Sequence, residues 1–94
     1  LEETLDRALL LFGEVTGLTR EQFLDAPRGR TGNRSRWVLA WWLRWQDRLS
    51  GGEVANLLDV SRARVSQMVR KARLAEEKPL EPYAEWMIRL REIG

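Results

Sequence analysis

The chain of 94 residues contains neither cysteine nor histidine. The lack of cysteine excludes disulfide bonds and thiolate zinc sites. The lack of histidine removes the commonest general base and metal ligand, and with them the Ser-His and Cys-His pairs of nucleophilic hydrolases. No pair of carboxylates stands out in an apolar setting either. We therefore expect no catalytic site, no metal site and no other cofactor in this chain.

Long apolar runs are also missing. No stretch approaches the roughly 20 apolar residues of a membrane span, and no signal peptide is recognisable. Hydrophobic residues make up 44% of the chain and charged residues 32%, which is typical of a globular protein. We expect one cytoplasmic domain with a modest core and no membrane contact.

The net charge of +2 is unevenly distributed along the chain. Residues 28–73 hold eleven Arg and Lys side chains against three acids, a net charge of +8. Residues 1–27 and 74–94 are acidic, with net charges of −4 and −2. A basic middle between acidic flanks favours a polyanionic partner. A solvated helical surface is the alternative that charge alone leaves open.

Helical periodicity dominates the first third of the chain. Apolar residues at three- and four-residue steps predict a helix over residues 1–16. Thr19 and Gln22 have the spacing of a capping box that opens a short second helix, and Pro27 ends it. Residues 28–36 hold four Arg, two Gly and no apolar side chain, which predicts an exposed basic loop.

Residues 37–49 are apolar around most of their circumference, which is typical of a helix at the centre of a small bundle. This predicted helix carries four of the five tryptophans. Core packing is one interpretation of the cluster, and a cofactor box or a base-stacking platform is the other. Four tryptophans exceed one core face, so we expect the C-terminal segment, a second copy or the rest of a larger protein to cover the excess. The residues expected at such a homodimer or parent-protein contact are Trp37, Trp41, Trp45 and Trp86.

Two helices joined by a tight turn are predicted in the second half of the chain. Ser50 and Glu53 have the spacing of a capping box, and Ser61 is suited to cap the second helix. Ala55 is small where the helices must cross closely, and Asp59 occupies a turn position that needs a left-handed backbone. This pattern is typical of the helix-turn-helix, whose second helix enters the DNA major groove. A last helix, after Pro79 and Pro82, has an apolar face containing Trp86, Leu90 and Ile93.

On a helical wheel, the valines of the second helix lie on the inward face, and its short polar and basic residues lie on the outward face. No carboxylate occurs between Asp59 and Glu76. Arginine reads guanine and glutamine reads adenine through paired hydrogen bonds. The residues predicted to read bases are Arg62, Ala63, Ser66, Gln67 and Arg70. Those predicted to contact phosphates or the minor groove are Arg28, Arg30, Arg34, Arg36, Ser61, Arg64, Lys71 and Arg73. A merely solvated basic helix, and a basic loop that only connects, are the alternatives.

Residues 1–73 resemble the DNA-binding domain at the C-terminus of the bacterial chromosomal replication initiator, a member of the Trp-repressor-like helix-turn-helix group. The resemblance is strongest in the run Arg-Trp-Val-Leu-Ala-Trp-Trp-Leu-Arg at residues 36–44 and in Leu49-Ser50-x-x-Glu53-Val54. It implies an all-α, compact bundle of about five to six helices containing a helix-turn-helix. Residues 1–76 would form the DNA-binding domain, and residues 77–94 a C-terminal helix packing on that domain or on a partner.

The same domain type is similar to the C-terminal domains of REP-associated transposases. Initiators carry Asp-His-x-Thr-Val at the start of the reading helix, where this chain has Ser-Arg-Ala-Arg-Val at residues 61–65. The resemblance therefore implies sequence-specific binding of double-stranded DNA as a C-terminal module of a transposase-like or other mobile-element protein, cytoplasmic and associated with the nucleoid. A replication-initiator or transcription-regulator domain is the alternative, and a protein-interaction module using the Trp-rich helix is an alternative of another class. Any catalytic domain of the parent would lie outside this chain.

Overall fold

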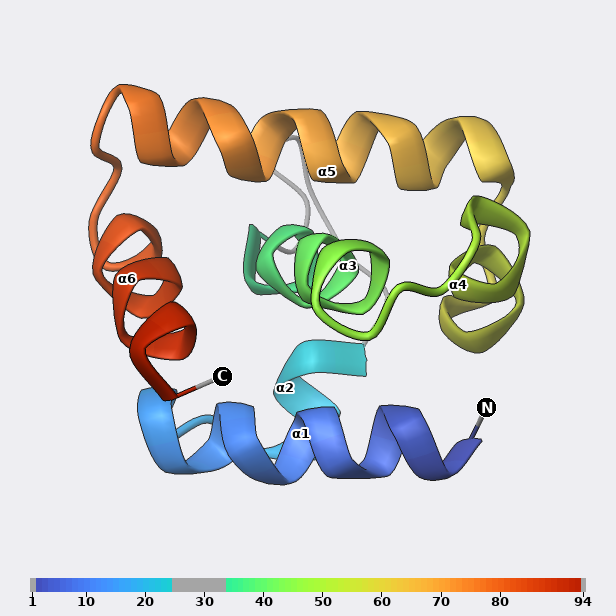
Figure 1. Cartoon of the computed structure of the whole chain (residues 1–94), viewed down its shortest axis with the longest axis horizontal. Helices are drawn as coiled ribbons and strands as arrows, with labels where there is room; N and C mark the ends of the chain where they lie inside the picture. The colour runs from blue at the N-terminus through green and yellow to red at the C-terminus, as the bar shows by residue number, and fades with distance from the viewer. Residues whose placement is uncertain (1, 25–33, 94) are drawn as a thin grey trace.

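The computed structural model describes residues 2–24 and 34–93, which form six α-helices and no strand (Figure 1). The helices are α1 (Glu2–Thr16), α2 (Arg20–Leu24), α3 (Arg34–Trp45), α4 (Gly51–Leu58), α5 (Arg62–Glu77) and α6 (Tyr83–Ile93). The radius of gyration is 12.0 Å, close to the value of about 12 Å expected for a compact domain of this length. The predicted all-α bundle of five to six helices is confirmed.

Helix α3 runs through the centre of the molecule and is seen nearly end-on in Figure 1, with α5 and α1 crossing on opposite sides of it. Every residue from Arg36 to Leu43 is buried, as expected for a helix that is apolar around most of its circumference. The predicted bounds of this helix were wrong at both ends. It begins at Arg34, and it ends at Trp45 because Arg48 adopts a left-handed backbone (φ 56°). Leu49 lies in the turn that follows α3, and its side chain is buried.

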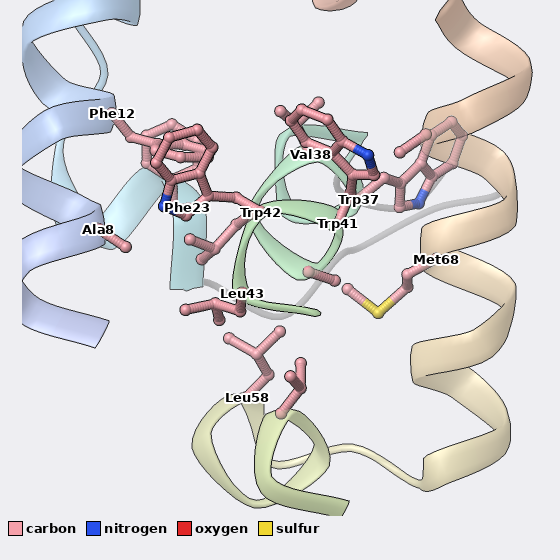
Figure 2. Packing of buried hydrophobic residues seen from close by; sticks show 14 of the residues in the cluster. Ala8, Phe12, Phe23, Trp37, Val38, Trp41, Trp42, Leu43, Leu58 and Met68 are labelled. Atoms are coloured by element: carbon pink, nitrogen blue, oxygen red, sulfur yellow. The ribbon is translucent and has the colours of Figure 1, made fainter. Parts of the chain in front are cut away.

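The predicted N-terminal helix is confirmed, and it buries one face of α1 against α2 and α3. The rings of Phe12 and Phe23 meet edge to face with centroids 5.4 Å apart, and those of Phe12 and Trp42 with centroids 5.9 Å apart (Figure 2). Phe23 is the buried residue of the short helix α2. The capping box before it is confirmed, since Thr19 N–H donates to Gln22 Oε1 at 2.8 Å and Gln22 N–H to Thr19 Oγ1 at 3.3 Å.

Helix α6 packs on the domain itself, which was one of the two alternatives expected for the C-terminal segment. Met87 and Leu90 belong to the same buried cluster as the cores of α1, α3 and α5. The guanidinium of Arg91 pairs with Glu76 near the end of α5, with Nη2 to Oε1 at 2.7 Å. Ile93, predicted to face inward, is 59% exposed. The inward face of α6 is therefore one turn shorter than the apolar pattern indicated.

Candidate nucleic-acid interface

The start of α4 is fixed by a reciprocal pair of hydrogen bonds. Glu53 N–H donates to Ser50 Oγ at 3.1 Å, and Ser50 N–H donates to Glu53 Oε1 at 3.0 Å. These bonds to Ser50 lower the pKa of the Glu53 carboxyl below its usual value, because they favour its charged form. The predicted capping box is confirmed, and it fixes where α4 begins relative to the end of α3.

The turn between α4 and α5 has the backbone that its sequence predicted. Asp59 is left-handed (φ 54°, ψ 52°), and Val60 N–H donates to Ala55 O at 3.0 Å. Ala55 is buried, as expected for a small residue at a close crossing. Ser61 caps α5, with its Oγ accepting from Arg64 N–H at 3.1 Å. The orientation of α5 against α4 is thus set by local hydrogen bonds as well as by packing.

Helix α5 separates an inward apolar side from an outward polar side. Val65, Met68 and Ala72 are buried against α3 and α4, as predicted, and Val69 is partly buried. The five residues predicted to read bases are all exposed on this helix, namely Arg62, Ala63, Ser66, Gln67 and Arg70. Glu76, the first acid of the helix, is paired with Arg91. The outward side from Arg62 to Arg73 therefore offers cations and polar groups without a carboxylate among them.

The positively charged side chains that flank the outward side of α5 lie against tryptophans of α3. Because α3 crosses beneath α5 (Figure 1), its two ends reach opposite flanks of that helix. Lys71 Nζ lies 5.1 Å from the ring centroid of Trp37, and Arg73 Cζ lies 4.4 Å from that of Trp45. Both distances are in the range of cation–π attraction. Lys71 and Arg73 are exposed and Arg64 is half-buried, whereas the hydroxyl of Ser61 is engaged as the helix cap.

The four arginines predicted in a basic loop divide into two groups. Arg28 and Arg30 lie outside the described residues. Arg34 and Arg36 belong to the first turn of α3 and not to a loop, so that part of the prediction was wrong.

Arg36 is a correction to the predicted phosphate contacts. Its side chain is buried, with 7% of the residue exposed, and Nη2 donates to Leu58 O at 2.6 Å. Burial, followed by the nearby charge of Arg64, lowers the pKa of Arg36 below its ordinary value. A guanidinium in this position is sequestered from a phosphate, and it ties α3 to the end of α4.

Arg62 lies back across the start of α4. A Cβ placed on Gly52 would be 2.8 Å from Arg62 Nη2, so the absence of a side chain at Gly52 makes room for this guanidinium. Gly51 is different, since a Cβ there would meet nothing within 4 Å. Arg62 therefore sits at the edge of the outward side, and Gln67 and Arg70 lie nearer its middle. The oxygen Oε1 of Gln67 accepts from Arg64 Nη1 at a long 3.4 Å.

A hollow of about 300 Å³ opens beside the outward side of α5. It is lined by Arg44, Gly51, Val65, Ser66, Val69, Arg70 and Arg73. Arg44 and Gly51 were not among the predicted site residues. Their charge and flexibility are visible in the sequence, but their place beside Arg73 depends on how α3 crosses α5, which no local pattern encodes.

The tryptophans expected to contact a partner are mostly covered by the chain itself. Trp37 and Trp41 are 9% and 6% exposed, so they leave little surface for another protein. Trp41 is covered in part by Arg91 of α6, whose Cζ lies 5.1 Å from its ring centroid. Trp86 is half-buried against Tyr83. Trp45 is the exception in this set, being 51% exposed.

Comparison of the chain with protein-family models, curated proteins and solved structures found no match. The part of the chain that the structure describes contains no cluster of three or more acidic side chains arranged to hold a metal ion. In residues 2–24 and 34–93, no helix has both the length and the apolar character needed to cross a membrane.

Proposed function

We propose that this chain binds double-stranded DNA sequence-specifically, with α5 in the major groove. The observation that carries the proposal is the outward side of α5, which is exposed, basic and without a carboxylate between Arg62 and Arg73. A major groove of about 12 Å admits an α-helix, and 16 residues of helix extend over about 24 Å. The capped turn and the buried valine side hold the helix so that this surface faces outward.

Two kinds of contact are assigned to the helix. We assign the exposed residues Gln67, Arg70 and Ala63 to base edges, since a glutamine reads adenine, an arginine reads guanine and a methyl group contacts thymine. Arg62 reaches a base edge only by leaving the surface of Gly52, so we assign it to the margin of the contact. Lys71 and Arg73, which flank the helix on their tryptophans, are assigned to phosphates.

We infer for the parent protein a transposase-like or other mobile-element role, with a replication initiator or a transcription regulator as the alternative. The support is the order of helices together with the Arg-Ala-Arg run at residues 62–64. In such a protein, this chain would select the DNA sequence, and the remainder of the protein would carry the catalytic activity.

A protein-interaction module is the second candidate function. One observation favours it: a largely apolar groove of about 330 Å³ is lined by Trp37, Leu74, Ala75 and Leu80 together with Lys71 and Lys78. Association through the apolar lining of this groove would depend much less on salt than DNA binding through many arginines and lysines, which releases counterions and weakens as salt rises. Salt dependence therefore separates the two candidates.

The deciding experiment is selection from a pool of random duplexes, followed by affinity measurements from 50 to 200 mM salt. About six phosphate contacts give a slope near −5 in a plot of log affinity against log salt. We expect one enriched sequence and a slope of that size. A palindromic sequence would indicate a two-fold dimer, and a single half-site a monomeric module. No enriched sequence together with a flat salt dependence would refute the proposal.

Gln67→Ala tests the reading helix directly. The variant should lose about 1–3 kcal/mol of discrimination at one base pair, because the bidentate contact to that base is lost. Its affinity for unrelated duplexes should stay within about twofold, since the glutamine carries no charge. The measurement is the affinity for each of the four base pairs at every position of the selected site.

The matched control for Gln67→Ala is Gln46→Ala, which removes an exposed glutamine in the turn after α3. It should leave discrimination unchanged at all positions. If Gln67→Ala and Arg70→Ala both discriminated between base pairs as well as the unsubstituted chain does, α5 would not be the reading helix.

A further inference from the structure

Three arginines from two helices converge on the hollow beside α5. Arg44 comes from the end of α3, and Arg70 and Arg73 come from successive turns of α5. Ser66 adds a hydroxyl group, and no carboxylate is among the lining residues. The nearest acid along α4, Glu53, already accepts a hydrogen bond from Ser50 N–H. Such a set of donors with a net positive charge is suited to a tetrahedral oxyanion.

Two of the three arginines are held in place before any ligand binds. Arg44 Nη1 donates to Leu49 O at 2.7 Å, which fixes the side chain along the turn. The ring of Trp45 lies beside both guanidinium groups, with its centroid 5.8 Å from Arg44 Cζ and 4.4 Å from Arg73 Cζ. Side chains that are already ordered lose less conformational entropy on binding. The half-exposed ring of Trp45 therefore orders two of the guanidinium groups that line the hollow.

We propose that this hollow seats one phosphodiester group of the DNA backbone, gripped by Arg44 and Arg73 and flanked by Ser66. The inference rests on the proposed function and refines it. It adds Arg44, which lies outside the two helices joined by the tight turn, to the interface. It also moves Ser66 from the reading residues to the backbone contacts, because Ser66 lines the hollow two helical turns before Arg73, on the same flank of α5. Arg70 also lines the hollow but lies nearer the middle of the outward side, so it stays a reading residue. One phosphate fixed at this point sets the register of α5 along the groove.

The first test measures duplex binding by Arg44→Met in the whole chain. Loss of a charge-assisted contact should lower the affinity for every duplex by about tenfold, and the salt slope should become shallower by about one. The ranking of base pairs should not change. The matched control is Arg7→Met, which removes one positive charge from an exposed position on α1, across the molecule from α5 (Figure 1). Screening over that distance should keep its effect below about twofold.

Trp45→Phe and Trp45→Leu test the positioning role. Phenylalanine keeps an aromatic face for the two guanidiniums, so Trp45→Phe should retain most of the affinity, whereas Trp45→Leu should lose about fivefold for all duplexes. If both variants lost affinity equally, Trp45 would act only as packing. Arg73→Met, at an exposed position, serves as a second variant should Arg44→Met fail to fold, and the same uniform loss is expected.

The second test uses inorganic phosphate in place of DNA. Added phosphate, compared with chloride at equal ionic strength, should shift the side-chain NMR signals of Arg44 and Arg73 and leave that of Arg7 unmoved. The proposal is supported if the chain binds DNA, if Arg44→Met lowers the duplex affinity by about tenfold, and if phosphate produces these shifts. DNA binding in which Arg44→Met equals Arg7→Met overturns the phosphate seat and leaves the proposed function standing. Phosphate shifts in a chain that binds no duplex overturn the DNA assignment and indicate a site for a free phosphate compound.

Discussion

Phe12→Ala is expected to lower the free energy of unfolding by about 3–5 kcal/mol. Phe12 is completely buried, and its ring contacts those of Phe23 and Trp42 edge to face. The substitution removes both aromatic contacts and leaves a cavity where α1, α2 and α3 meet. A domain of this size is stable by only about 5–14 kcal/mol in total. The variant should therefore unfold at a much lower urea concentration, as followed by circular dichroism.

Leu10→Ala is the control for this prediction, since Leu10 lies on the same helix but is 72% exposed. Its substitution should change the free energy of unfolding by less than about 0.5 kcal/mol. Equal losses in the two variants would mean that α1 does not pack through the Phe12 side of the helix. The packing of the N-terminal helix would then have to be revised.

Arg36→Met is the second large effect that we expect, a loss of about 2–3 kcal/mol of stability. Methionine keeps the apolar stem of the side chain but not the guanidinium that donates to Leu58 O at 2.6 Å. That carbonyl ends α4 immediately before the left-handed Asp59. Once its partner is gone, a buried acceptor is left without a hydrogen bond, which costs more than the bond itself contributed. Urea unfolding measures the loss.

Arg20→Met is the matched control for Arg36→Met, because Arg20 pairs with Asp6 on the surface, where both side chains are about half exposed. An exposed ion pair contributes little, so this variant should lose less than about 1 kcal/mol. DNA binding provides the decisive contrast. If Arg36→Met kept full stability but lost duplex affinity as Arg44→Met is expected to do, Arg36 would be a phosphate contact after all, as its place in a basic run first indicated.

Local signals were sufficient to predict much of the framework of the candidate site. The caps at Thr19, Ser50 and Ser61 depend on residues three positions away, so the sequence around each contains all the partners involved. The left-handed Asp59 follows from the shortness of the turn. The outward side of α5 follows from its helical periodicity. Each of these predictions concerns neighbours in the chain.

The features that sequence reasoning missed depend on contacts between distant segments. The arginine, glycine and polar residues that precede Arg36 predict a loop, yet the hydrogen-bond partner of Arg36 lies 22 residues further on. Leu49 is buried although it lies in a turn and not in a helix. An apolar residue in the sequence indicates a side chain that faces the core, but it does not indicate whether a helix or a turn carries that side chain. Arg44 and Arg73 meet at Trp45 because two helices cross, and the crossing is a property of the whole core.

The division of α5 into two sides has a consequence for how such a domain could change its target. The side chains that hold the helix in the molecule, such as Val65 and Met68, are different residues from Ala63 and Gln67, which are exposed. Under the proposed function, new side chains at the exposed positions would redirect the protein to other DNA sequences without repacking the core. The residues that maintain the fold and the residues that select the DNA sequence can then change independently, and one fold could recognise many DNA sequences.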